Sequence, residues 1–388
     1  MKIIHLLSLT ALLLSASCQD TVEKATPQTN CSLNAPNHPN AAKYQQIVEK
    51  FAQAGAVGVS ITIKTPQGTW SNATGKADFT NNVALSPCHT MRIGSISKTF
   101  AAATILKLQD EGKLNINDKA SKYLPAEYVE KIKNLDKVTL RNLLQHTSGI
   151  HEYLGFEGIM RIQNFSAKGL SAKENLRYSF GKKADFEPGT EWVYANVNYI
   201  LLALVIENIT KKTAYEAVTE KIIKPLGLQN TYASTTIPAS MSRGYYDTMN
   251  NGIMRDQTPI DHNAVGGQDM LDGGMISNSY DLAIFMEALN TGKLLSAKSM
   301  ADLGLKIGFE VKDIPEELSY IKDYGLGVFQ LDIDGKKGTG HAGNVFCFNG
   351  IAYYFPAQKM SISILINSYS KELYKVLFSK EVLKIALQ

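Results

Sequence analysis

The residues best suited to chemistry by type and spacing are Ser95 and Lys98, which precede a long apolar segment. Phe100, Thr104 and Leu108 recur near helical spacing within an Ala-rich run, and this pattern predicts a buried helix that reaches Gln109. A serine in the first helical turn lies among unpaired backbone N–H groups, and a lysine three residues later lies on the same face. The pair therefore fits a nucleophile and its base.

The Ser-x-x-Lys spacing alone does not decide this assignment. It occurs four times, at Ser95, Ser179, Ser319 and Ser368, and the last three lie in polar or acidic stretches. Only Ser95 precedes a long apolar helix. The spacing still allows an alternative in which Ser95 caps the helix and Lys98 lies on the surface.

Two other short motifs carry groups that could act on a substrate. Tyr194-Ala-Asn196 is the only Tyr-x-Asn in the chain, and His341-Ala-Gly343 is the only His-x-Gly. A phenol can relay a proton, an amide can hold a substrate amide, and a glycine lets a substrate approach a strand edge. Each motif also has a structural alternative: a half-buried phenol, a turn asparagine and a histidine at the end of a strand.

The elements that must position these residues follow from periodicity. Strands are predicted near both ends of the chain, at 57–63, 69–74, 325–331, 346–355 and 360–366. Helices are predicted at 44–54, 95–109, 139–145, 199–209, 214–223, 279–289 and 371–387. Strands from both ends around a helical middle indicate an α+β fold, with one antiparallel sheet built from both termini and a helical insertion. We expect one domain over 41–388, with a sheet part at 41–92 and 290–388 and a helical part at 93–289.

Taken in this order, the motifs resemble the serine β-lactamase and penicillin-binding protein superfamily. The resemblance is closest to its class C-like branch, which includes D,D-carboxypeptidases, D-aminopeptidases and esterases. The supporting segments are His146-Thr-Ser-Gly-Ile150, Pro225-Leu-Gly-Leu228, Gly273-Gly274 before Asp281-Leu282, and Tyr324-Gly-Leu-Gly327. The resemblance implies a β-lactamase/transpeptidase-like fold and a serine hydrolase that forms an acyl-enzyme.

The resemblance also implies a role for each motif residue. Ser95 is the expected nucleophile, and Lys98 and Tyr194 are expected to move its proton, with His341 close to Tyr194. Asn196 is expected to orient the substrate. Backbone N–H groups of Ser95 and of Asn344, which follows Gly343, are expected to hold the oxyanion. No cofactor or metal is implied.

Departures from the family pattern shape the expected substrate. The third motif carries His341 and Ala342 where class C β-lactamases have lysine and threonine, which favours esters or D-amino-acid amides and peptides. A D,D-carboxypeptidase, a class C β-lactamase, a transacylase and a non-catalytic binding protein remain alternatives. His341 is expected to be partly charged at pH 7, so that its protonation disturbs the Tyr194 relay. Cys347 is expected near the rim of the pocket.

The N-terminus predicts export. Residues 1–18 carry a positive start, a short apolar run and small residues, which together are typical of a signal peptide. The residues before Cys18 resemble a lipoprotein lipobox, although Ser15 replaces the usual Leu, and plain signal cleavage is the alternative. Residues 19–40 are polar and are expected to form a disordered tether. The protein is thus expected to be periplasmic or membrane-anchored.

The cysteines and the net charge limit the remaining function classes. With Cys18 lipidated, Cys31 and Cys88 could form a disulfide outside the cytoplasm. No CxxC motif or Cys/His cluster is present, and His146 and His151 lack the partners of a zinc site. The formal net charge of +4 comes without a basic block, so no nucleic-acid partner is expected. The expected partner is a small ester, amide or peptide substrate.

Overall fold

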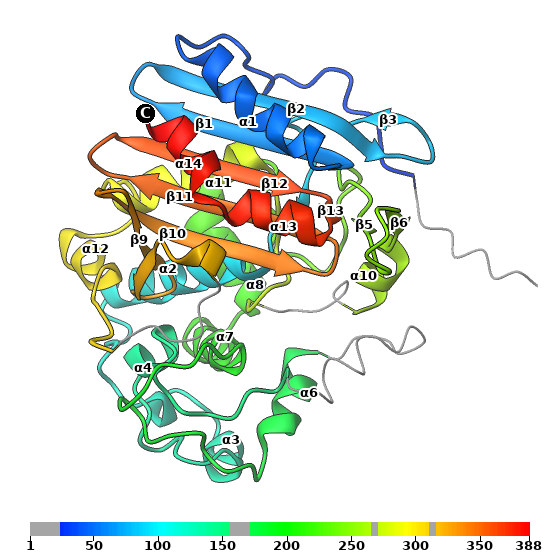
Figure 1. Ribbon diagram of the computed structural model, residues 1–388. Helices are drawn as coiled ribbons and strands as arrows, with labels where there is room; N and C mark the ends of the chain where they lie inside the picture. Colours follow the sequence, from blue (N-terminus) through cyan, green and yellow to red (C-terminus); the bar gives the residue numbers. More distant parts are fainter. Residues whose placement is uncertain (1–23, 155–170, 265–270, 310–315) are drawn as a thin grey trace, which may run out of the picture.

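The computed structural model describes residues 24–154, 171–264, 271–309 and 316–388 (Figure 1). At its centre lies an eight-stranded antiparallel sheet. In spatial order its strands are β3 (Val83–Ala84), β2 (Gly68–Asp78), β1 (Gly58–Thr65), β12 (Met360–Ile366), β11 (Phe348–Phe355), β10 (Lys336–Val345), β9 (Phe329–Ile333) and β8 (Ile321–Tyr324). The β1–β12 ladder pairs Val59 with Ile366 and so joins the two ends of the chain, which confirms the predicted α+β fold.

Helices cover both faces of this sheet (Figure 1). One face carries α1 (Ala41–Gln53), α13 (Lys371–Phe378) and α14 (Lys380–Leu387), and the other carries α11 (Ser279–Asn290). The alternation along β1 sets the two layers. Ile61 and its apolar neighbours two residues away belong to the core under α1, whereas Thr62 Oγ1 lies 2.9 Å from Ser279 Oγ of α11. Burying each large apolar side chain in such a core stabilises the fold by roughly 1.5–3 kcal/mol.

The helical region lies beyond α11 and is centred on α7. It contains α2 (Ser97–Asp110), α3 (Ala126–Lys131), α4 (Leu140–Leu144), α6 (Ala172–Leu176), α7 (Val197–Thr210), α8 (Ala214–Val218) and α9 (Lys224–Leu226). The α7 helix is apolar on all sides and buried from Val197 to Ile206, and it packs against α2, α4 and α8. Stacking of Phe100 on Phe285, with ring centroids 3.8 Å apart, joins α2 to α11 and thus to the sheet.

Smaller elements complete the chain. They are β4 (Met91–Arg92), β5 (Tyr245–Tyr246), β6 (Arg255–Asp256), α10 (Thr258–Ala264), β7 (Ile276–Ser277), α12 (Ala297–Leu303) and β13 (Ser368–Tyr369). Single turns of 3₁₀-helix lie at η1 (Gly94–Ile96), η2 (Ala120–Lys122), η3 (Arg177–Ser179) and η5 (Glu316–Leu318), and a π-helical turn lies at η4 (Thr219–Ile223). Among the described residues, no helix is both long and apolar enough to cross a bilayer.

Several predicted elements differ from the observed ones. The strand predicted at 325–331 is interrupted, because the chain turns between β8 and β9 with Gly327 at φ 72°. The His341-Ala-Gly343 motif precedes the strand predicted at 346–355, but it lies inside β10, where no strand was predicted. The predicted helix 371–387 is two helices, since Ser379 between them has an extended ψ of 144°. The α11 helix, expected in the helical part, packs on the sheet.

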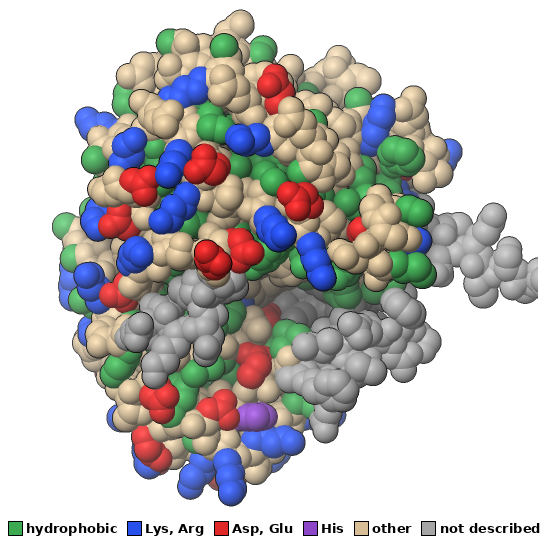
Figure 2. Space-filling view, in the orientation of Figure 1, with side chains coloured by type: hydrophobic (Ala, Val, Ile, Leu, Met, Phe, Trp, Pro, Cys, Tyr) green, Lys and Arg blue, Asp and Glu red, His purple; other side chains and the backbone are tan. Residues whose placement is uncertain are grey.

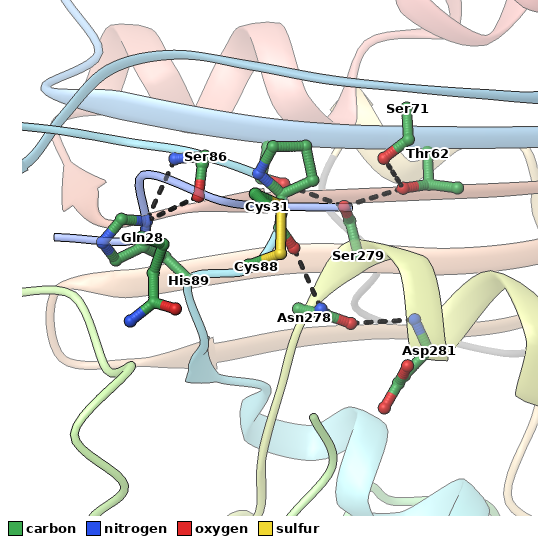
Figure 3. Close-up of a disulfide and its surroundings, with 12 residues drawn as sticks. Gln28, Cys31, Thr62, Ser71, Ser86, Cys88, His89, Asn278, Ser279 and Asp281 are labelled. Atoms are coloured by element: carbon green, nitrogen blue, oxygen red, sulfur yellow. Dashed lines mark hydrogen bonds between the residues drawn. A yellow bond between two sulfur atoms is a disulfide. The ribbon is translucent and has the colours of Figure 1, made fainter. Parts of the chain in front are cut away.

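The segment 24–40 lies against the domain, so the predicted disordered tether is wrong for these residues. A disulfide joins Cys31 to Cys88 (Figure 3), the pairing that the sequence left open. Ala35 forms a bridge to Ser71, and the buried Ala25 donates its N–H to Asp78 Oδ2 at 3.4 Å. The predicted signal peptide and Cys18 lie outside the described residues.

Candidate active site

Ser95 and Lys98 lie at the junction of η1 and α2, where the sequence predicted the start of a helix. Ser95 is partly exposed in η1, and Lys98 is completely buried one turn later. Lys98 Nζ donates to Ser95 Oγ at 3.0 Å. The alternative in which Lys98 is a surface residue is therefore wrong, and the two side chains form a contact pair.

Lys98 Nζ has two further acceptors. It donates to Asn196 Oδ1 at 2.7 Å and to the backbone carbonyl of Asp272. Lys98 Nζ thus lies within hydrogen-bond distance of three oxygens, and a buried amino group needs such polar partners. This arrangement holds Lys98 in one position against Ser95 and Asn196.

Tyr194 lies beside this pair, just ahead of α7. Lys98 Nζ lies 5.0 Å from the centroid of the Tyr194 ring, and the imidazole of His146 lies 4.2 Å from the same ring. Among the described residues, the Tyr194 hydroxyl is buried without a hydrogen-bond partner. An unpaired buried hydroxyl next to the nucleophile is available to exchange a proton with a substrate.

The edge of β10 lies next to Ser95. Strand β9 pairs with β10 only as far as Gly340, so β10 continues past its neighbour from His341 to Val345. A Cβ atom on Gly343 would lie 1.9 Å from the carbonyl oxygen of Ile93 and 3.2 Å from the Ser95 nitrogen. Only a glycine permits this approach. It brings the backbone of Gly343 and Asn344 to η1, where the two expected oxyanion donors lie.

A chain of hydrogen bonds behind the site connects His146, Tyr324 and His341. Ala195 N–H donates to His146 Nδ1 at 3.1 Å, so the neutral ring carries its proton on Nε2, which lies 3.2 Å from Tyr324 Oη. His341 Nδ1 can only donate to the carbonyl oxygen of Ala342, which leaves its Nε2 to accept from Tyr324 Oη at 3.1 Å. The direction of each bond is therefore fixed when both imidazoles are neutral.

Both histidines are neutral near pH 7. Burial lowers the pKa of His341 to about 3, and the charge of Lys98 also lowers it. Burial likewise lowers the pKa of His146 well below its usual value, again together with Lys98. The expectation that His341 is partly charged at pH 7 is wrong, because the ring is buried and burial disfavours its charged form. Its ring centroid lies 6.2 Å from that of Tyr194, so the two groups are neighbours without a hydrogen bond.

Two carboxyl groups next to Lys98 were missed by the sequence reasoning. Glu152 accepts from the backbone N–H groups of Asn196 and Leu154, the latter at 2.8 Å. Asp272 accepts from the Tyr153 hydroxyl at 2.6 Å, and its carbonyl accepts from Lys98. Burial raises the pKa of both carboxyl groups. Glu152 follows the His146-Thr-Ser-Gly segment and Asp272 precedes Gly273-Gly274, and this proximity to recognised motifs was the only available signal.

A cavity of about 420 Å³ opens on Ser95. The residues that line it carry no formal charge; they are Ser95, Trp192, Val193, Tyr194, Leu318, Ile321, Phe329, His341, Ala342, Gly343, Asn344, Tyr374 and Phe378. Cys347, which we expected at the rim, is fully buried and is not among them, and burial raises the pKa of its thiol. Its Sγ packs against Gly244, where an added Cβ would lie 2.1 Å from that sulfur.

The outer face of the molecule at α1, α13 and α14 carries scattered charged side chains of both signs (Figure 2).

Among the described residues, no cluster of three or more His, Cys, Asp or Glu side chains could hold a metal ion. The chemistry of the described site rests on its hydroxyl, amine, amide and imidazole groups.

Solved structures of similar fold cover most of this chain. A D-stereospecific amidohydrolase from Streptomyces sp. is 27% identical, with a TM-score of 0.73 over 88% of this chain and 99% of its own. A D-amino acid amidase from Ochrobactrum anthropi SV3 is 23% identical, with a TM-score of 0.75 over 89% and 95%. The octameric penicillin-binding protein homologue of Pyrococcus abyssi is 23% identical, with a TM-score of 0.74 over 90% and 78%.

Sequence comparisons agree with the fold. Protein flp of Staphylococcus aureus (strain MW2) is 33% identical over 187 residues, which are 48% of this chain and 36% of that protein. Penicillin-binding protein 4* of Bacillus subtilis is 29% identical over 160 residues, 40% of this chain and 33% of that protein. The alignments thus span about a third of the length of these relatives. The family model described as Beta-lactamase matches residues 44–377, and the chain therefore belongs to the β-lactamase family of serine hydrolases.

Proposed function

We propose that this protein is an exported hydrolase that cleaves esters or D-amino-acid amides and peptides through an acyl-enzyme on Ser95. The observation that carries the proposal is the 3.0 Å contact of Ser95 Oγ with Lys98 Nζ, next to the unpaired hydroxyl of Tyr194. A nucleophile, a proton carrier and an open strand edge then meet at one point.

The steps follow from these positions. Ser95 Oγ attacks the carbonyl carbon of the substrate while Lys98, as the neutral amine, takes up the serine proton directly or through the Tyr194 hydroxyl. The N–H groups of Ser95 and Asn344 stabilise the oxyanion. Tyr194 delivers the proton to the leaving nitrogen or oxygen, and the bond to the leaving group breaks. Water then attacks the ester on Ser95, and the same pair returns a proton to Ser95 Oγ.

The substrate class is supported by the third motif. Penicillins and D-Ala-D-Ala peptides present a free carboxylate near the bond that breaks. Ala342 offers this anion no hydroxyl, and His341 is neutral because burial lowers its pKa to about 3. Losing one hydrogen bond to a charged group costs about 1.5–3 kcal/mol, or roughly ten- to a hundredfold in kcat/KM. The Streptomyces structure with 27% identity, a D-stereospecific amidohydrolase, supports D-amino-acid amides as an alternative to simple esters.

Intact mass spectrometry tests the nucleophile. The wild type is expected to gain one fluorophosphonate adduct, and a Ser95→Ala variant is expected to gain none. In parallel, kcat/KM is measured for p-nitrophenyl acetate, D- and L-phenylalanine amide, nitrocefin and a D-Ala-D-Ala peptide. We expect an ester or the D-amide to exceed the last two at least tenfold. Faster hydrolysis of nitrocefin would instead indicate a β-lactamase, and faster trimming of D-Ala-D-Ala a D,D-carboxypeptidase.

A further inference from the structure

The cavity beside Ser95 has an unusual wall for a site that must bind polar substrates. Seven of its lining residues are large or branched apolar side chains: Trp192, Val193, Leu318, Ile321, Phe329, Tyr374 and Phe378. They come from the Tyr194 loop, from η5, from β8, from β9 and from α13, so five separate segments build one apolar surface. Tyr374 and Phe378 are the two residues that α13 contributes to this surface.

The charged residues of α13 do not line the cavity. Lys371, Glu372 and Lys375 are exposed, whereas Phe378 is buried and Tyr374 is half-buried. Because the two aromatic residues are four positions apart, they lie on the same helical face. Lys371 and Lys375 each lie three positions before one of these aromatic residues, so the two exposed cations flank the aromatic face.

The position of Tyr194 indicates which part of a substrate enters this cavity. In acyl transfer the leaving atom must receive a proton, and the Tyr194 hydroxyl is buried without a partner among the described residues. Tyr194 lines the cavity together with the two residues before it, Trp192 and Val193. Asn196, which accepts from Lys98 Nζ, and Glu152, which accepts from the Asn196 N–H, do not line it. The leaving group thus departs toward the aromatic wall, and the acyl part lies toward Asn196.

From this arrangement we infer that the enzyme selects substrates by an apolar leaving group, an uncharged alkyl or aryl alcohol or amine that fills the cavity against Tyr374 and Phe378. The inference rests on the proposed acyl-enzyme function and specifies its substrate. A cavity of about 420 Å³ accommodates a group much larger than ammonia or methanol. Each methylene that it buries should raise kcat/KM roughly fourfold.

The test uses D-phenylalanine esters that differ only in the alcohol. The three alcohols are methanol, n-butanol and 4-hydroxybutanoate, which is esterified through its hydroxyl so that its carboxylate stays free. All three are alkyl leaving groups of similar intrinsic reactivity. The last two have similar length and differ by the terminal carboxylate. We expect the wild type to hydrolyse the butyl ester at least tenfold better than the methyl ester, and at least tenfold better than the carboxylate ester, measured as kcat/KM.

A cation placed in the wall should change this preference. In Tyr374→Arg the ratio of carboxylate to butyl ester hydrolysis is expected to rise about tenfold. Ser319→Arg adds the same cation at an exposed position next to Leu318, outside the cavity lining, and is expected to keep the wild-type ratio within twofold. A second wall variant, Phe378→Ala, is expected to lower the butyl-to-methyl ratio at least fivefold.

The outcomes separate the inference from the function on which it rests. If the wild type hydrolyses the methyl ester but shows no preference for butyl, or if Tyr374→Arg and Ser319→Arg change the ratio equally, the leaving-group assignment is wrong while the hydrolase function stands. If no ester is hydrolysed and Ser95 takes up no fluorophosphonate, the proposed function fails, and the inference fails with it.

Discussion

Replacing His341 by Gln should flatten the pH dependence of stability. The His341 ring is 1% exposed, and burial lowers its pKa to about 3, against 6.5 for the free side chain. A histidine with a depressed pKa contributes stability above pH 6.5 and loses it as the pH falls, because the unfolded chain takes up a proton that the folded chain does not. Between pH 7.5 and pH 5 this single ring should lower the free energy of unfolding by about 2 kcal/mol.

The assay is urea denaturation of wild type and His341→Gln at pH 7.5, 6.5, 5.5 and 5.0. Other groups also titrate in this range. Burial lowers the pKa of His146, so this group also destabilises the folded protein as the pH falls. Burial raises the pKa of Asp281 to about 6, so this group stabilises the folded protein as the pH falls. Both proteins contain these groups, so their contributions cancel in the difference between the two curves. That difference should change by about 2 kcal/mol across the range.

Parallel curves for the two proteins would refute the reasoning, since they would mean that His341 binds a proton in the folded state at pH 5. The neutral state of His341 also predicts how activity depends on pH. A neutral His341 predicts no inflection in kcat/KM from this residue between pH 5 and 9. Any fall in kcat/KM at low pH should then persist in the His341→Gln variant, provided that the variant keeps measurable activity.

Four further predictions concern single groups. Ser95→Ala should lower kcat at least about a thousandfold while the melting temperature stays within a few degrees, measured by steady-state kinetics and calorimetry, because one helix-mouth hydroxyl stabilises by only about 1 kcal/mol. Replacing Cys31 and Cys88 by Ser should lower the free energy of unfolding by about 2–4 kcal/mol in urea titrations, since their bridge closes a loop with a sequence separation of 57. Ala342→Thr should restore a hydroxyl to β10 and narrow the gap between nitrocefin and p-nitrophenyl acetate in kcat/KM. If Cys18 is lipidated as predicted, mass spectrometry of membrane fractions should find a lipid mass on the wild type and none on a Cys18→Ser variant.

Local patterns were enough to predict most of the sheet. The alternation in 57–63 and 360–366 gave β1 and β12, and the strands from both termini do pair. The strand predicted at 325–331 failed for a reason outside that segment. A Cβ on Gly327 would lie 2.6 Å from the Ala102 Cβ, and the Gly327 carbonyl accepts from Thr99 Oγ1 at 2.8 Å. Packing on α2 thus imposes a turn where the apolar pattern alone indicates a strand.

The site could be predicted only where its residues lie in short motifs. Ser95, Lys98, Tyr194 and His341 do meet in the structure, as their order along the chain implied. The aromatic wall could not be predicted, because Tyr374 and Phe378 lie on a helix whose spacing is typical of any amphipathic helix. The break at Ser379 has no Gly or Pro signal either, yet it ends α13 directly after Phe378.

The hydrogen-bond chain behind Tyr194 gives a role to His146 and Tyr324, two motif residues that do not line the cavity. His146, Tyr324 and His341 come from three separate segments, and each is at most 1% exposed. Removing any one hydroxyl or imidazole would leave at least one buried donor or acceptor of its neighbour unpaired, at a cost of about 1–3 kcal/mol. Because the His146 ring also packs against the Tyr194 ring, such a loss would change the position of Tyr194 without altering any residue that contacts the substrate. The three residues therefore act together as a rigid, uncharged support that holds Tyr194 and the edge of β10 in place around Ser95.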